Sequence, residues 1–193
     1  LPILEQESLP ATLYVYTEAV ESQKALINIL MPALVRLSKV PKLEFNFLAG
    51  ELSCLDMQDK ELVIEKLAPY IEQLNAEQRE SFCEVLASKL GFDFEQIMQS
   101  RQFGLMSFEE ITDANRRGLD IQLHTHTHTC DVEMPEKLVS EIQINRKKLL
   151  PFVTSSLKHF CYPSGVYTSD MYPYLAESQV YSATLTQIGL VEK

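Results

Sequence analysis

The chain has 193 residues, of which 46% are hydrophobic and 23% charged, and its formal net charge at pH 7 is -10. This composition is typical of a globular protein with enough length for one sizeable core. The acidic balance argues against nucleic acid or an anionic membrane surface as a partner, and no run of roughly 18 apolar residues predicts a transmembrane helix.

The first 17 residues are predicted to form one helix-to-strand step. Residues 1–7 resemble the end of a helix. Residues 10–16 are rich in β-branched and aromatic side chains, and Pro10 stands at the first position, where a strand tolerates proline. Because no initiator Met and no basic leader precede this step, we expect the chain to be incomplete at this end.

Residues 18–102 differ in character, and we predict a mostly helical insertion there. Apolar residues at helical spacing around Pro32 predict a helix that the proline kinks or ends. The alternation of apolar residues over 43–47 indicates a hairpin strand, with a turn at Gly50. Three further helices are predicted to begin near Asp59, at the capping-box pair Asn75 and Gln78, and at Phe94. Their apolar stripes favour packing within the insertion over a ligand site, although the insertion could cover a cleft as a lid.

Strands and helices alternate after residue 106. Ser107 and Glu110 form a capping box for a helix that Gly118 ends. The segments that follow are a strand over 119–123, a helix from Pro135, a strand over 158–162, a turn at 163–165, a helix over 169–177 and a strand over 180–185. This alternation predicts a parallel sheet or barrel, in which functional residues lie on loops after the carboxyl ends of strands.

Three of the four histidines lie at alternate positions after the strand at 119–123. Neutral imidazole is the commonest protein ligand for zinc and similar metals. If the strand continues, His124, His126 and His128 share one face. If it stops, His124 and His128 can turn back onto one ion while His126 points elsewhere. The pattern favours a metal site over an exposed strand end, with a third ligand, usually a carboxylate, supplied from elsewhere.

The order and spacing of several segments resemble the polysaccharide deacetylases, the carbohydrate esterases of the NodB-homology type. The run 124–128 is similar to the family's His-Ser/Thr-x-x-His motif, and residues 160–165 are similar to its third motif. Further segments resemble the strand after the first motif (9–15), the helix before the second (106–118), and the strand and turn beyond the third (181–185 and 189–190). The resemblance covers residues 1–17 and 106–190 and leaves the insertion outside the common domain.

The resemblance implies a distorted (β/α) barrel over residues 1–193, incomplete at both ends, with the helical insertion at about 18–102. It implies a metal-dependent hydrolase that removes N-acetyl groups from a polysaccharide or amino sugar, with zinc as the expected divalent metal and carbohydrate as the partner. His124 and His128 would be the metal ligands, and the Ser164 backbone N–H would stabilise the oxyanion. The residues expected to brace the loop or line the substrate cleft are Thr125, His126, Tyr162, Pro163 and Gly165.

The chain departs from the family pattern in three places. The Thr-Phe-Asp-Asp-Gly type motif, which supplies the catalytic base and third ligand, would precede Leu1 and is not in this sequence. The late Leu-x-His motif is missing, and His159 as a substitute acid is less expected than a packed histidine. Cys161 stands where the third motif begins with Arg. The alternative functions are therefore a non-catalytic metal- or glycan-binding relative, an inert fragment, or another barrel metallohydrolase acting on an amide.

The cysteines and tyrosines give weaker indications. The four cysteines show no C-x-x-C spacing, which predicts unpaired thiols, as in a reducing compartment, whereas the family resemblance also allows the cell envelope or secretion. Cys130 and Cys161 lie close to the two motifs. Several tyrosines follow the third motif, where half-buried packing is favoured over stacking on sugar rings. The sequence does not indicate an oligomeric state.

Overall fold

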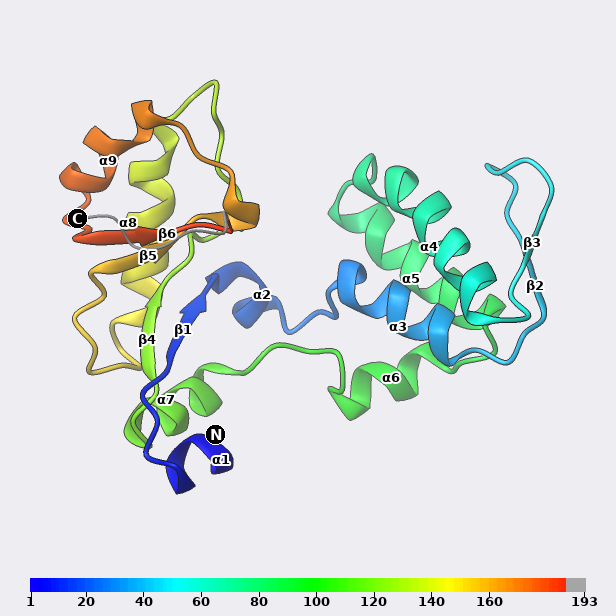
Figure 1. Cartoon of the computed structure of the whole chain (residues 1–193), viewed down its shortest axis with the longest axis horizontal. Coiled ribbons are helices and arrows are strands. Elements are labelled where there is room, and N and C mark those ends of the chain that lie inside the picture. The colour runs from blue at the N-terminus through cyan, green and yellow to red at the C-terminus, as the bar shows by residue number, and fades with distance from the viewer. Residues whose placement is uncertain (187–193) are drawn as a thin grey trace. The chain divides into compact units, whose positions relative to one another are not determined.

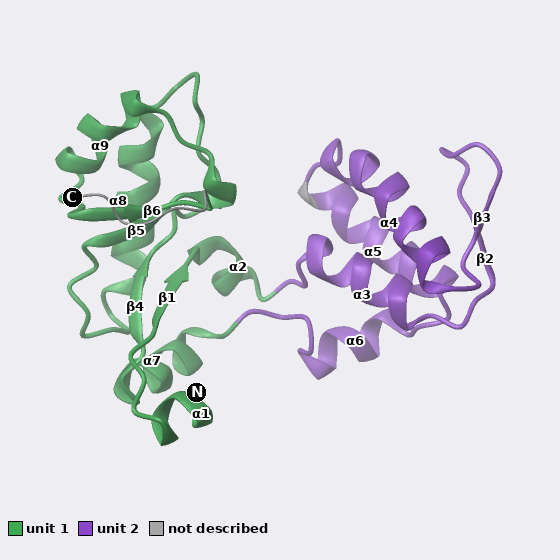
Figure 2. Ribbon diagram, in the orientation of Figure 1, with its two compact units in different colours: residues 1–23, 106–193 green, residues 24–105 purple. Residues whose placement is uncertain are grey.

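The computed structural model describes residues 1–186 (Figure 1). The chain forms two compact units (Figure 2): unit 1 contains Leu1–Gln23 and the chain from Met106 onward, and unit 2 contains Lys24–Leu105. Each unit has its own cluster of buried hydrophobic side chains. Unit 2 occupies most of the segment predicted to be an insertion, and its status as an insertion in a single deacetylase-like domain stays a prediction.

Unit 1 is built on a four-stranded sheet in the order β1-β4-β5-β6. The strands are β1 (Thr12–Val15), β4 (Asp120–Leu123), β5 (His159–Cys161) and β6 (Ser182–Thr184). All three pairings are parallel, which confirms the predicted parallel sheet in a mixed α/β structure. Closure of this sheet into a barrel stays a prediction.

The central strand β4 is buried on both faces. Ile121 and Leu123 are fully buried, and Gln122 between them is only 2% exposed. The Gln122 amide is tolerated inside because Nε2 donates to Asp120 and Oε1 accepts the His159 N–H, at 2.9 Å and 3.0 Å.

Helices alternate with the strands of unit 1. They are α1 (Pro2–Gln6), α2 (Thr17–Ser22), α7 (Phe108–Arg116), α8 (Lys137–Leu149) and α9 (Tyr172–Glu177), with 3-10 turns η1 (Pro163–Gly165) and η2 (Ser169–Met171). The predicted capping box of Ser107 and Glu110 starts α7, and both of its hydrogen bonds form. The predicted turn at 189–190 lies outside the described residues.

Unit 2 contains four helices and one hairpin among its described residues. They are α3 (Ile27–Leu37), α4 (Met57–Glu72), α5 (Ala76–Lys89), α6 (Phe94–Ser100), β2 (Lys42–Glu44) and β3 (Glu51–Ser53), the two strands being antiparallel. The capping box of Asn75 and Gln78 forms at the start of α5. Gly50 has the positive φ of 80° expected at the hairpin turn.

Two local details in unit 2 differ from the prediction. α3 does not end at Pro32 but continues through it to Leu37, so of the two predicted effects of this proline the end of the helix was wrong. The carbonyl that loses its partner there belongs to Asn28, which is exposed and accessible to water, while buried residues such as Leu34 hold the helix to the core. The predicted hairpin strand ends at Glu44, so the alternating residues Phe45 and Phe47 lie in the turn that follows.

Two further predictions from the sequence concern the cysteines and membrane-spanning helices. All four cysteines are free, which confirms the prediction of unpaired thiols. Within residues 1–186, none of the helices combines the length and apolar character needed to cross a membrane.

We expect unit 1 to fold after removal of residues 24–105. The two cores share no residue, and within unit 1 the Gln23 Nε2 donates to the Met106 carbonyl at 3.5 Å, so the ends flanking the deletion are already adjacent. A short Gly/Ser linker should therefore join them without strain. The truncated protein should give a dispersed NMR spectrum and a cooperative thermal transition. Aggregation of this variant, together with correct folding of the whole chain, would contradict the proposed boundary.

Candidate metal centre

Three neighbouring parallel strands end at one edge of the unit 1 sheet. Residues Val15 of β1 and Phe160 of β5 both lie opposite Leu123 of β4. Parallel strands bring the residues that follow their carboxyl ends together, which is where α/β proteins place their functional groups. The segments at this edge are Tyr16 with Thr17 after β1, residues 124–128 after β4, and residues 162–165 after β5.

The rings of the two outer histidines lie together at this edge, in an edge-to-face arrangement. β4 ends at Leu123, so His124 begins a loop, hereafter the histidine loop (residues 124–128). Thr125 and His128 adopt left-handed backbone conformations, with φ of 60° and 61°, and these turn the chain back on itself. The ring centroids of His124 and His128 are 4.9 Å apart. Of the two geometries predicted for this segment, the structure has the one in which the strand stops before the loop and His124 and His128 turn back toward each other.

His126 points away from this pair. Its Nδ1 lies 2.9 Å from the hydroxyl oxygen of Thr17, and its backbone carbonyl accepts the N–H of Glu18 at 2.9 Å. The middle histidine is therefore attached to the start of α2. Its predicted place in the substrate cleft stays a prediction.

A backbone carbonyl fixes the tautomer of His124. The Nδ1 atom lies 2.6 Å from the carbonyl oxygen of Cys161, at the end of β5. Because a carbonyl can only accept, Nδ1 carries the proton and Nε2 keeps its lone pair. Metal-binding histidines are usually oriented by such a hydrogen bond. Cys161 precedes the Pro163–Gly165 turn by two residues, so this hydrogen bond also links His124 to the segment that carries the turn.

Both rings are held in the neutral form. Burial lowers the pKa of His124 below its ordinary value of 6.5, although the bond to Cys161 partly opposes this shift. Burial lowers the pKa of His128, and repulsion from the His124 ring whenever that ring is protonated lowers it further. Neutral imidazole is the form that binds a metal. The donor chemistry therefore fits two ligand positions of a zinc site.

Tyr16 packs against both histidines and was missed by sequence reasoning. Its ring centroid is 4.8 Å from that of His128 and 6.5 Å from that of His124. Burial and then the negative charge of Glu18 raise the pKa of Tyr16 to about 12, so the phenol keeps its proton. The only signal in the sequence was its position at the carboxyl end of a predicted strand.

Two polar side chains of α8 contact the backbone of the histidine loop. The Glu141 carboxylate accepts the N–H groups of His126 and Thr127, each at 2.9 Å. One turn later, Asn145 accepts the N–H of His124 at 3.1 Å and donates to the Val15 carbonyl at 2.9 Å. Neither residue was predicted, although an asparagine within the apolar stripe of a helix is a recognisable signal.

The Thr125 hydroxyl makes no hydrogen bond within residues 1–186, although the residue is fully buried. The family resemblance assigns this side chain to bracing the loop. In the structure, the bonds to the loop backbone come from α8 and from the start of α2. A role for the Thr125 hydroxyl stays a prediction.

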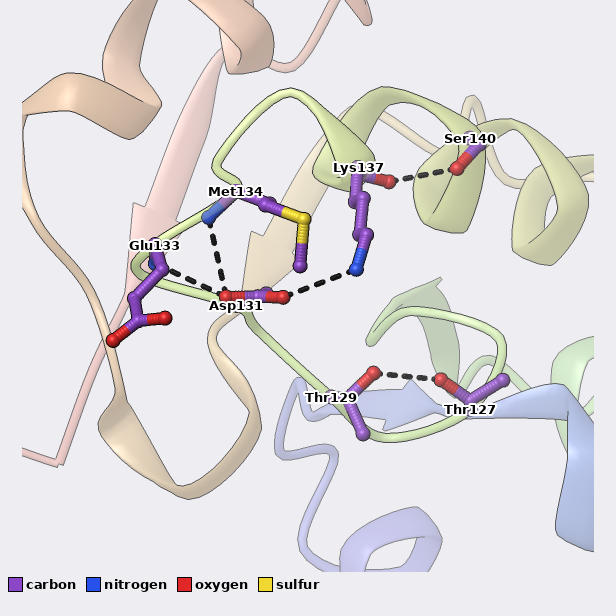
Figure 3. Close-up of polar contacts among 7 residues, drawn as sticks. All are labelled: Thr127, Thr129, Asp131, Glu133, Met134, Lys137 and Ser140. Carbon is purple, nitrogen blue, oxygen red and sulfur yellow. Dashed lines mark hydrogen bonds and ion pairs between the residues drawn. The ribbon is translucent and has the colours of Figure 1, made fainter.

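Asp120 and Asp131, the aspartates nearest to the histidine loop in sequence, bond to residues outside that loop. Asp131 accepts the N–H groups of Glu133 and Met134 and pairs with the Lys137 Nζ at 3.2 Å, so it organises the turn before α8 (Figure 3). Asp120 lies at the amino end of β4 and bonds to Thr12 and Gln122. In the described part of the chain, no group of three or more His, Cys, Asp or Glu side chains is arranged to hold a metal ion.

The predicted oxyanion donor lies in the tight turn η1. Ser164 has a left-handed backbone, with φ of 55° and ψ of 12°. The N–H groups of Gly165 and Val166 bond to Tyr162 and Pro163, whereas the Ser164 N–H has no acceptor within residues 1–186. A Cβ on Gly165 would lie 2.1 Å from the Thr186 hydroxyl, and its φ is 69°, so this position requires glycine.

Other residues near the two motifs are packed. Tyr162 is 1% exposed and contacts the Phe160 ring at 5.1 Å, so its ring offers no face to solvent. Burial raises the pKa of the Cys130 thiol to about 12, which keeps it protonated and unreactive. His159, the considered substitute acid, starts β5 and bonds to Ser182 through Nδ1 at 2.8 Å.

The metal-free protein should lose stability as the pH falls below about 6.5, which is the ordinary pKa of histidine. Because the folded protein lowers the pKa of His124 and His128, the unfolded chain binds more protons between the lowered values and the ordinary one. Stability should therefore decline through this window, and the contribution of His124 and His128 to the decline should be complete below it. Urea unfolding in the presence of chelator, over a pH series, measures the slope. An equal slope in the His124→Gln/His128→Gln double variant would contradict this assignment.

Residues 92–183 match the family model described as polysaccharide deacetylase. The matched range contains both the histidine loop and the Pro163–Gly165 turn, and the resemblance seen in the sequence is thereby confirmed. A search of curated proteins finds no match. Among solved structures, the chain is similar to the Streptococcus pyogenes deacetylase PplD in complex with acetate, with 13% identity and a TM-score of 0.37, covering 88% of this chain and 80% of that one.

Proposed function

We propose that this protein removes N-acetyl groups from a polysaccharide or amino sugar in a metal-dependent reaction, a function that the match of residues 92–183 to the polysaccharide deacetylase model supports. We propose that its sheet is part of a distorted (β/α) barrel and that the metal is divalent, zinc being the expected ion. The observation that carries the proposal is the pair His124 and His128, whose ring centroids are 4.9 Å apart at the carboxyl edge of a parallel sheet.

In this proposal the two neutral imidazoles hold the metal. His124 presents its Nε2 lone pair because Nδ1 is bonded to Cys161, and His128 faces it from the other end of the histidine loop. When bound, a divalent ion supplies Lewis acidity toward an amide carbonyl and lowers the pKa of water. Tyr16 covers the pair from the β1 side and limits the access of bulk water to it.

The Ser164 N–H supplies oxyanion stabilisation in this scheme. It is a backbone donor with no acceptor in the described part of the chain, held by a turn that requires Gly165. The turn follows β5, whose last residue Cys161 bonds to His124. A fixed donor of this kind contributes roughly 3 kcal/mol to transition-state stabilisation. We assign no catalytic base and expect the third ligand to be a carboxylate.

A second candidate function is non-catalytic binding of metal or glycan. It is favoured by the observation that residues 1–186 bring together no group of three ligands. The two candidates differ in one measurable property, the release of acetate.

Metal analysis and an acetate-release assay on the purified protein test both candidates. The deacetylase predicts stoichiometric zinc and acetate release from a chitooligosaccharide, with release lost in the His124→Ala/His128→Ala double variant. Stoichiometric zinc without acetate release from a panel of N-acetylated glycans would exclude the deacetylase and leave non-catalytic binding as the function. No zinc and no release would overturn the proposal.

A further inference from the structure

We propose that Glu141 and Asn145 of α8 are the positioning residues that set the shape of the histidine loop, and that the Thr125 hydroxyl does not set it. This inference rests on the proposed metal site and adds the residues that determine its geometry.

Glu141 holds the centre of the loop through two adjacent N–H groups. One carboxylate oxygen accepts the N–H groups of His126 and Thr127, both at 2.9 Å. These two residues lie between the left-handed residues Thr125 and His128, which make the reversal. Successive N–H groups converging on one anion form an anion-binding nest, and bonds to a charged acceptor are roughly twice as strong as neutral ones. The reversal therefore depends on the acceptor that α8 supplies.

Asn145 holds the start of the loop and attaches it to β1. Its side-chain oxygen accepts the N–H of His124, and its amide nitrogen donates to the Val15 carbonyl at 2.9 Å and to the Thr17 hydroxyl at 3.3 Å. The residue is fully buried, so water does not compete for these bonds. Asn145 thus fixes the end of β4 relative to the end of β1.

The same network explains the orientation of the middle histidine. Because the Asn145 amide donates to the Thr17 oxygen, the Thr17 hydroxyl can give its own proton to Nδ1 of His126, 2.9 Å away. His126 is then an attachment point of the loop, which leaves the outer rings to face each other. The loop backbone is held at its first residue and at its centre.

Helix α8 can act as a rigid support because its position is fixed by the core. Residues 141 and 145 are four apart and share one side of the helix. The neighbouring Leu138, Ile142 and Leu149 are buried in the unit 1 core. By contrast, Thr125 is buried without a hydrogen-bond partner among the described residues, so its hydroxyl contributes no such restraint.

The test compares Glu141→Ala, Glu141→Gln and Thr125→Val in the whole chain, with Glu133→Ala as a matched control. The Glu133 side chain points away from the neighbouring polar contacts (Figure 3), so the control removes an equal charge from the surface. Zinc affinity, measured by competition with a chromophoric chelator, should fall roughly 10- to 100-fold in Glu141→Ala, as expected for loss of a group that orients ligands. Glu141→Gln, which keeps an acceptor oxygen, should restore part of that loss, and the other two variants should match the wild type.

A second readout separates this proposal from the proposed function. In the metal-free protein, amide hydrogen exchange at His126 and Thr127 should accelerate in Glu141→Ala and stay unchanged in Thr125→Val. If the wild type binds no zinc, the proposed function fails while the exchange measurement still tests the positioning role. Equal exchange in Glu141→Ala and the wild type, or a loss of zinc affinity in Thr125→Val as large as in Glu141→Ala, would overturn the inference.

Discussion

Replacing either His124 or His128 with Ala is expected to abolish zinc binding while leaving the fold intact. The two side chains are the imidazoles whose ring centroids lie 4.9 Å apart in the histidine loop, and each would supply one ligand beside the expected carboxylate. Loss of either imidazole leaves at most two of these three protein ligands, so zinc should fall from roughly one per chain to background. Elemental analysis of the purified variants measures the effect.

His159→Ala is the matched control for this pair. His159 is on the same sheet, but it starts β5 and bonds to Ser182, whereas the Cys161 carbonyl that holds His124 ends β5. The control should keep the zinc content of the wild type. Unchanged zinc content in both His124→Ala and His128→Ala would rule out this site, and loss of zinc in the control would show that the metal binds elsewhere.

The features predicted correctly from the sequence are those that nearby residues determine. The capping boxes at Ser107 and Asn75 formed because the cap and its partner lie three residues apart. The parallel sheet followed from the alternation of short apolar strands with helices. The turn of the histidine loop was one of two predicted geometries, and the choice depended only on where β4 ends.

The features that were missed depend on residues distant in sequence. Asn145 bonds to the Val15 carbonyl across 130 positions, and Thr17 reaches His126 across 109 positions. No local pattern specifies such pairs, because the packing of α8 and β1 against β4 brings them together. The burial of Tyr162 is of the same kind, since its local sequence favoured packing over a sugar platform but did not specify a fully buried position. Likewise, core packing outweighed the local effect of Pro32 in α3.

Chelation of the metal is expected to lower the melting temperature of unit 1. A ligand that binds only the native state and is present at about 100 times its Kd stabilises that state by about 2.7 kcal/mol. For a unit of about 110 residues, each kcal/mol corresponds to roughly 4 °C, so removal of zinc should lower the transition of unit 1 by about 11 °C. Differential scanning calorimetry with and without EDTA measures the shift.

The two cores provide an internal control for the chelation experiment. The histidine loop packs on the core of unit 1, whereas the core of unit 2 contains none of the proposed ligands. EDTA should therefore move a transition of unit 1 and leave one of unit 2 in place, and it should move neither in the His124→Ala/His128→Ala double variant. The shift should also shrink as the pH falls and protons compete for the imidazoles. An equal shift in the double variant would assign the stabilising metal to another part of the protein.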